Sequence, residues 1–90
     1  MKISEENSNK AVITTKYIMH YEKDITYVLY DEDGDWQFLS NEQVNEKDAM
    51  VVSVQQILER DASLTELPNI KKNQVMVRNS TGSNWVYQKK

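Results

Sequence analysis

Closely spaced carboxylates are the residues of this chain that come nearest to a recognisable chemistry. The stretch 31-DEDGDWQFLS-40 places four acidic side chains within five residues. Positions 1, 3, 5 and 12 of a calcium-binding loop are matched by Asp31, Asp33, Asp35 and Glu42. That template requires glycine at position 6, where Trp36 stands. The flanking residues also have the pattern of strands rather than helices, so the sequence favours a loop that binds no metal.

The same stretch carries the strongest short-range signal for a β-hairpin. Asp33-Gly34 is a dipeptide that tolerates the positive φ angles required at both central positions of a type I′ turn. Residues on both sides of it alternate as strand residues do. We therefore expect the carboxylates to stay in water. Trp36 and Phe38 are expected to enter the core as structural anchors, each burying about 150–250 Å².

Residues able to perform catalysis are scarce. The chain has one histidine, His20, and no cysteine. Its two glycines are Gly34 and Gly82, which is too few for a Gly-rich phosphate loop, and the sequence contains no G-x-S-x-G motif. Carboxylate pairs can act in acid–base chemistry, but an exposed turn offers no buried environment to tune them. The sequence predicts a protein that is not an enzyme and that uses no cofactor.

Length and composition indicate one small globular domain. The chain has 90 residues, of which 39% are hydrophobic and 28% charged. The lack of cysteine fits a reducing compartment, and no apolar stretch approaches the roughly 20 residues that span a bilayer. Two glutamates near the N-terminus argue against a signal peptide, so we expect a cytoplasmic protein without a membrane partner. Residues 1–10 are polar and unpatterned, which predicts a frayed or disordered N-terminus before a single domain over residues 11–90.

Charge is distributed unevenly along the chain. Residues 21–48 contain nine acids and two bases, a balance of −7, whereas residues 68–90 contain five bases and no acid. Such asymmetry can steer a charged partner, or the two segments can fold back and neutralise each other. Because phosphate contacts need a clustered basic face, we do not expect nucleic acid as a partner.

Periodicity predicts an α+β fold with a small, mostly antiparallel sheet of about five or six strands and one main helix over about residues 53–60. Strands are expected within residues 11–19, 25–32, 33–40 and 49–52, and a C-terminal hairpin within residues 73–79 and 84–90. Both faces of the strand at 25–32 are partly apolar, which suggests a central strand covered on each side. Ser53 and Gln56 can form a capping box at the helix start.

Arg78 lies on a strand of alternating valines. An inward-pointing arginine needs an acidic partner, because an unpaired charge is not buried. We therefore predict that Arg78 pairs with Asp61 or with an acid of the DEDGD turn. Together with Trp85, it is predicted to be a structural anchor.

The order of these features resembles a bacterial family, the immunity-protein domain numbered thirty-three of polymorphic toxin systems, formerly a domain of unknown function. The resemblance covers about residues 11–86. It consists of a strand before an acidic turn, a Trp-x-Phe pair, hydrophobics before a D-x-x-L step, a Leu-Pro, and an arginine-bearing strand with a tryptophan close behind. The matching positions are Asp35, Trp36, Phe38, Ile57, Leu58, Asp61, Leu64, Leu67, Pro68, Arg78 and Trp85.

This chain departs from the family pattern in three places. Family members tend to have glycine soon after the Leu-Pro, a small residue before the arginine step, and a glycine-containing acidic stretch after the Trp-x-Phe pair. Here the corresponding residues are Asn69–Lys72, Met76 and Ser40–Glu42. These departures argue against a ligand site shared with the family around the loop after the Trp-x-Phe pair. They do not change the expected fold.

The resemblance implies a small α+β protein that binds and neutralises a toxin. Neutralisation would work by occlusion, with an acidic face covering a basic cleft. We therefore expect a non-catalytic protein-binding module whose possible partner is a cognate toxin. One alternative is a small-ligand or metal-binding domain, and another is a structural or self-associating protein. The sequence leaves a homo-oligomer possible under each of these hypotheses. The residues expected to contact the partner are Asp31, Glu32, Asp33, Asp35, Glu42 and Glu46.

Overall fold

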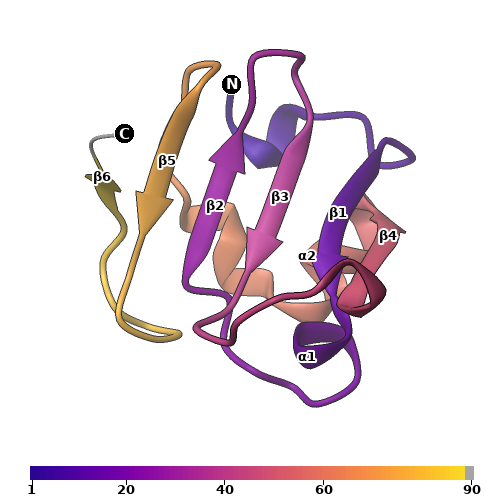
Figure 1. Cartoon of the computed structure of the whole chain (residues 1–90). Helices are drawn as coiled ribbons and strands as arrows, with labels where there is room; N and C mark the ends of the chain where they lie inside the picture. The colour runs from indigo at the N-terminus through magenta and orange to yellow at the C-terminus, as the bar shows by residue number, and fades with distance from the viewer. Residues whose placement is uncertain (89–90) are drawn as a thin grey trace.

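A computed structural model describes residues 1–88, and its centre is a single six-stranded mixed sheet (Figure 1). The strands are β1 (Ala11–Thr15), β2 (Tyr27–Tyr30), β3 (Trp36–Leu39), β4 (Ala49–Ser53), β5 (Gln74–Val77) and β6 (Val86–Gln88). Their order in the sheet is β4-β1-β3-β2-β5-β6. The pair β1–β3 is parallel and the other four pairs are antiparallel, which confirms the predicted α+β fold.

The helices are few and short. They are α1 (Lys16–Met19) and α2 (Val54–Arg60), with 3-10 turns η1 (Ile3–Glu5), η2 (Glu46–Asp48) and η3 (Ala62–Glu66). Within the described residues, no helix has both the length and the apolar character to cross a membrane. The prediction of a strand extending to residue 90 includes Lys89 and Lys90, which lie outside the described residues.

The main helix begins where the sequence predicts. Ser53 is the N-cap of α2, because its Oγ accepts a hydrogen bond from the backbone N–H of Gln56 at 3.1 Å. Gln56 Oε1 in turn accepts from the Ser53 N–H at 2.8 Å, which completes the capping box. Val54 and Ile57 are buried, so a seven-residue helix that is too short to be stable alone is held by packing on the sheet.

The hairpin β2–β3 forms as predicted, but the turn type was predicted wrongly. Gly34 has a φ of +84°, whereas Asp33 does not have a positive φ. The Gly34 N–H donates to the Asp31 carbonyl at 3.1 Å, and the Asp31 N–H donates to the Asp35 carbonyl at 2.8 Å. The loop therefore has three residues, and its last residue is a left-handed glycine that forms a bulge. Glycine occupies the single position where a side chain would be strained, so the second positive φ of a type I′ turn is not needed.

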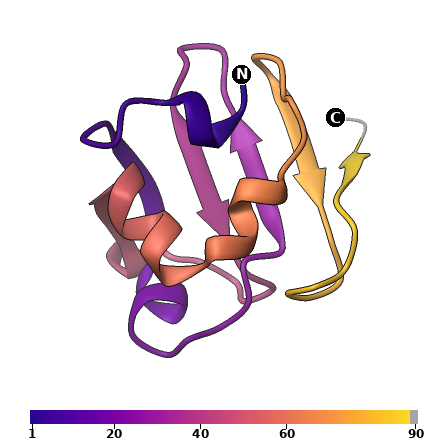
Figure 2. The same ribbon diagram turned by 180° about the vertical axis from the view of Figure 1, so that it is seen from behind.

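The core lies between the sheet and one layer formed by α2, η1 and η3, which Figure 2 shows in front of the strands. Trp36 and Phe38 are completely buried there, as predicted. The Trp36 ring stacks on Tyr30 with 4.4 Å between centroids and lies 6.0 Å from Phe38. These aromatics come from neighbouring positions of β2 and β3, so the hairpin itself builds the centre of the core.

The opposite face of the sheet is open across β3, β2 and β5, and it is turned toward the viewer in Figure 1. The sequence correctly placed β2 at the centre of the sheet but wrongly predicted a covering layer on both sides. Tyr27 and Leu29, which point to this face, are only half-buried. The second apolar face of β2 is therefore not explained by packing within this chain.

The N-terminal segment is an ordered part of the fold, and the prediction that residues 1–10 are frayed was wrong. Ile3 is completely buried in the core. The Met1 carbonyl accepts from the Ile70 N–H at 3.0 Å, and the Met1 ammonium donates to the Ile70 carbonyl at 2.9 Å. One isoleucine in a polar segment carries no periodicity, so its role depends on contacts with residues that are distant in the sequence.

Candidate protein-binding surface

The turn between β2 and β3 gathers four of the six acids predicted to contact a partner. Asp31 Oδ1 accepts from the backbone N–H groups of Asp33 and Asp35, both at 2.9 Å. This carboxylate holds the loop in one conformation, as side chains of this type do in turns. The neighbouring Glu32 and Asp33 are exposed. The result is a rigid acidic projection at the end of the sheet.

The calcium-loop arrangement is not assembled by this fold. Carboxylate oxygens of Asp31, Asp33 and Asp35 lie within 4.8 Å of one another, but one oxygen of Asp31 already accepts two hydrogen bonds from the loop backbone. Glu42 follows β3 at its far end. Four strand residues lie between, which at about 3.3 Å per residue is a separation of roughly 13 Å. Strands rather than helices flank the turn. These acids therefore do not converge as the template requires.

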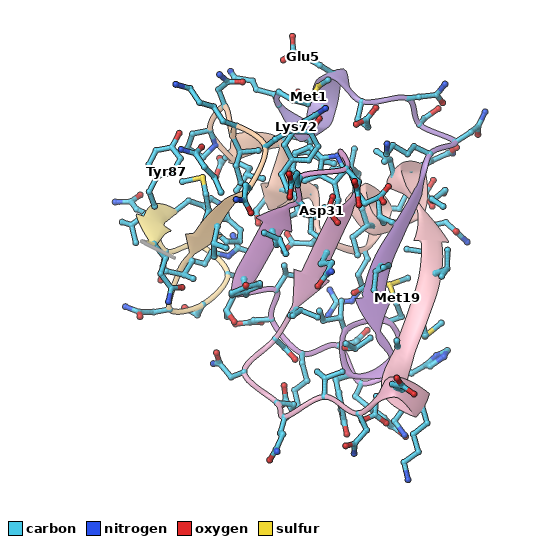
Figure 3. All side chains as sticks on the ribbon, turned by 45° about the horizontal axis from the view of Figure 1, so that its top comes forward. Met1, Glu5, Met19, Asp31, Lys72 and Tyr87 are labelled. Atoms are coloured by element: carbon cyan, nitrogen blue, oxygen red, sulfur yellow. The ribbon has the colours of Figure 1, made fainter. Side chains whose placement is uncertain are left out.

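Cations from other segments lie beside the acidic turn. Lys10 Nζ is 4.0 Å from Asp35 Oδ1. A Cβ placed on Gly34 would be 3.7 Å from the Lys72 Cε, so the lysine stem passes directly over the turn. Met1, Lys72 and Asp31 lie at the same end of the molecule in Figure 3. Lys10 and the stem of Lys72 therefore lie beside the acidic turn, on which Glu32 and Asp33 are exposed.

The other two predicted contact residues, Glu42 and Glu46, lie beyond the opposite end of β3. Glu42 accepts a hydrogen bond from the Ser40 hydroxyl and lies 3.7 Å from Lys23 Nζ. The hydrogen bond from Ser40 is the main cause that holds the pKa of Glu42 below its ordinary value. Glu46 is exposed in η2. The six acids therefore form two groups at opposite ends of the sheet, and not one continuous acidic face.

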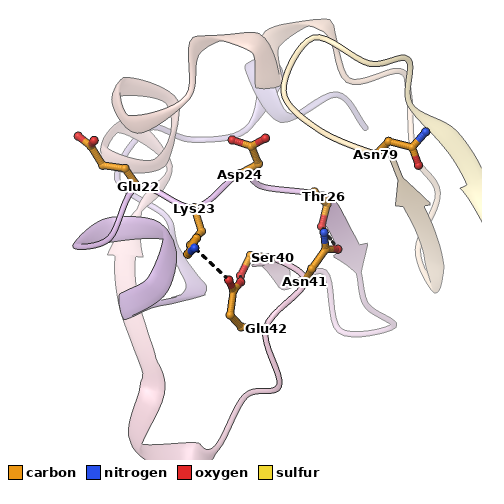
Figure 4. Close-up of a pocket in the computed structure, with 8 residues that line it drawn as sticks. All are labelled: Glu22, Lys23, Asp24, Thr26, Ser40, Asn41, Glu42 and Asn79. Atoms are coloured by element: carbon orange, nitrogen blue, oxygen red, sulfur yellow. Dashed lines mark hydrogen bonds and ion pairs between the residues drawn. The ribbon is translucent and has the colours of Figure 1, made fainter.

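Glu42 also borders a polar pocket of about 360 Å³ (Figure 4). Its described lining consists of Glu22, Lys23, Asp24, Thr26, Ser40, Asn41, Glu42 and Asn79. The Thr26 hydroxyl donates to Asn41 Oδ1 at 3.0 Å, and Asp24 accepts from the Thr81 N–H at 3.2 Å. The Ser40 hydroxyl donates to the Glu42 carboxylate, but the lowered pKa of Glu42 makes that carboxylate a weak base for activating a nucleophile. The described lining is polar throughout and includes Glu22, Lys23, Asp24 and Glu42 as its charged side chains.

Asp48 is a buried carboxylate close to this end of the molecule. It accepts from the Asn45 N–H at 3.1 Å and the Tyr17 hydroxyl at 3.2 Å, and it lies 3.1 Å from Lys16 Nζ. The Asn45 hydrogen bond, followed by Lys16, lowers the pKa of Asp48 below its ordinary value. Sequence analysis did not find this residue, because two of its three partners, Lys16 and Tyr17, are distant in the chain.

The lowered pKa of Asp48 leads to a prediction for acid unfolding. Between the ordinary aspartate value of about 3.9 and the lower folded value, the unfolded chain binds more protons than the folded one. The contribution of Asp48 is therefore complete above about pH 4 and is lost as the pH falls through its folded pKa. We expect calorimetric unfolding midpoints to fall over this range, and to fall less steeply in Asp48→Asn. An equal slope in both proteins would contradict this role.

Arg78 is held by four groups in the interior. Its Nε donates to the Ile25 carbonyl at 2.8 Å, and its two terminal nitrogens donate to Ser63 Oγ at 2.9 Å and Asp61 Oδ2 at 2.7 Å. The guanidinium carbon also lies 4.2 Å from the centroid of the Trp85 ring. The predicted pairing of Arg78 with Asp61 is confirmed. All three nitrogens are used within the chain, so Arg78 and Trp85 stabilise the fold.

The open face of the sheet contains residues that sequence analysis did not single out. Cross-strand partners place on this side of the sheet Ala11, Ile13, Thr15, Tyr27, Leu29, Gln37, Leu39, Ala49, Val51, Ser53, Val75, Val77, Val86 and Gln88. Of these residues, Thr15 and Val75 are buried. None of these side chains is charged, in a chain with 28% charged residues. Ile13, Val51 and Val86 are 38%, 71% and 54% exposed. The signal in the sequence was the second apolar face of residues 25–31, which was interpreted as buried.

The chain matches none of the protein-family models, curated proteins or solved structures with which it was compared.

Proposed function

We propose that this protein is a non-catalytic protein-binding module. The observation that carries the proposal is the uncovered face of the sheet, where solvent meets valine, isoleucine, leucine and tyrosine without one charged side chain. A sheet covered on one side normally presents polar residues to water on the other. A contiguous exposed apolar patch is typical of an interaction surface.

The more specific proposal is a cytoplasmic bacterial immunity protein that neutralises a cognate toxin. Its support is the resemblance to the immunity-protein family and the acidic turn. Most positions that carry the resemblance serve the fold: Trp36, Phe38, Ile57, Leu64 and Leu67 are buried, and Asp61, Arg78 and Trp85 form one cluster. The matching positions therefore support a similar architecture. The proposal of toxin neutralisation rests on what the resemblance to the family implies.

The acidic turn is the part of the surface suited to a basic toxin. It is held rigid by Asp31, so little conformational freedom is lost when a partner binds. Its outward acids, Glu32 and Asp33, lie beyond the end of the strands, where they can attract a cationic cleft from solution. Charge of this kind acts mainly on the association rate and depends on salt.

The proposal is tested by capturing a protein partner from the source cell and by co-expressing the toxin-like reading frame expected beside the gene. We expect the double variant Glu32→Lys/Asp33→Lys to slow association at least about 10-fold at low salt. The matched control is Glu59→Lys/Glu66→Lys, which makes the same charge change at exposed residues of the helical layer. Absence of a partner at micromolar concentration, or an equal loss in both variants, would argue against it.

A further inference from the structure

We propose that the open face of the sheet binds a second copy of this chain, so that two sheets pack face to face. This inference rests on the proposed function, because it names the occupant of the surface that identifies a binding module. The acidic turn, at the end of the strands, stays outside this contact and available to a different partner.

The charge distribution favours a second copy as the occupant. The chain has a net charge of −3, so two copies repel each other in most orientations. The open face is an exception, because its fourteen residues named above carry no charge. Contact through it buries no unpaired charge, which would otherwise be strongly unfavourable. A basic partner, by contrast, gains nothing electrostatic from a neutral surface.

Symmetry makes the face complementary to itself. In a two-fold dimer the same patch serves both subunits. β3 and β2 are the two central strands of the sheet, so aligning the centres of two faces brings Leu29 and Leu39 of one copy onto the same residues of the other. Two sheets packed in this way lie about 10 Å apart, with their side chains interdigitated.

The size of the face determines how tight the dimer is. Six strands about 4.8 Å apart, with about four residues each at about 3.3 Å, give a footprint of roughly 400 Å². A stable interface buries about 800 Å² on each partner. The footprint is about half of that area, so we expect a reversible dimer in the class of weak, transient complexes.

The test is analytical ultracentrifugation of the full chain from 5 µM to about 1 mM, with the oligomeric mass as the readout. We expect the average mass to rise from monomer toward dimer over this range. Val51→Lys/Val86→Lys should weaken the dimer at least about 10-fold, because it puts charge on two well-exposed positions of the face. The control, Val44→Lys, adds one of these two charges at another exposed valine that lies outside the strands, and it should leave the dimer unchanged.

Backbone amide NMR over the same concentration range locates the contact. Concentration-dependent shifts are expected at Ile13, Leu29 and Leu39, with the helix α2 unaffected. A monomer at 1 mM, shifts confined to α2, or equal effects of Val44→Lys and the face variant would overturn the inference.

Partner capture separates this inference from the proposed function. Suppose that the chain stays monomeric and captures a partner that Val51→Lys/Val86→Lys no longer captures. That partner then occupies the face, and only the inference of a second copy is wrong. If a dimer forms but no partner is captured, the inference stands and the immunity proposal falls. Glu32→Lys/Asp33→Lys should leave the dimer constant unchanged.

Discussion

Replacing Arg78 with methionine is expected to destabilise the fold by about 3–5 kcal/mol. The substitution keeps the volume of the stem but leaves the Asp61 carboxylate and the Ile25 carbonyl without their buried donor. A domain of this kind has a free energy of unfolding of about 5–15 kcal/mol, so the loss is about a fifth of it or more. Urea unfolding followed by circular dichroism measures the effect directly.

A double-mutant cycle shows whether the unpaired charge causes this loss. Asp61→Asn removes the negative charge but keeps an oxygen that can accept from the Ser63 N–H. In that background, Arg78→Met should cost about half as much, because no buried charge is left behind. Arg78→Lys should recover little, since an ammonium group cannot reproduce three directed hydrogen bonds and the stacking on Trp85. Equal costs in both backgrounds would show that packing, and not the ion pair, is responsible.

Replacing Trp36 with alanine is expected to cost about 3–5 kcal/mol. Trp36 is completely buried, stacks on Tyr30, and donates from Nε1 to Glu6 at 3.1 Å. The variant therefore leaves a cavity at the centre of the core and releases the N-terminal segment. For a domain of 60–100 residues, 1 kcal/mol corresponds to about 4–8 °C, so calorimetry should show the midpoint lower by at least about 12 °C.

Two controls separate the contributions to this effect. Glu6→Ala removes the acceptor of the indole N–H and should cost about 1 kcal/mol, the usual value of one hydrogen bond. Trp85→Ala removes an indole that is only partly buried at the margin of the core, so its cost should be smaller than that of Trp36→Ala. A loss below 1 kcal/mol in Trp36→Ala would contradict the central place given to this ring.

Local patterns were sufficient to predict most of the architecture. The hairpin around Gly34, the capping box of Ser53 and Gln56, and the inward direction of Trp36 and Phe38 each depend on residues a few positions apart. The turn type was missed because the pattern Asp-Gly fits both a two-residue loop and a three-residue loop with a bulge. The choice depends on how the strands align beyond the turn.

The candidate surface was harder to predict because it depends on how faces are covered. The second apolar face of Tyr27 and Leu29 was visible in the alternation of residues 25–31. Periodicity indicates that a face is apolar, but it does not say whether another part of the same chain lies over it. Likewise, Asp31 and Glu42 are close in the sequence but lie at opposite ends of β3, because a strand separates them.

The strand expected within residues 11–19 ends at Thr15, and Lys16–Met19 form α1 instead. Sequence patterns alone predicted the other strands, the capped helix, the aromatic anchors and the need of Arg78 for an acidic partner. These follow from side-chain period, turn chemistry and the high free energy of an unpaired buried charge, which act whatever the rest of the chain does. Only the tertiary structure decided that Met1 pairs with the backbone of Ile70 and Ile3 enters the core, that the acids separate into two groups, and that one sheet face is left open. Those outcomes depend on which distant segments pack together. A small domain can bury only part of its apolar surface in one core, so the packing of the whole chain decides which apolar residues stay exposed.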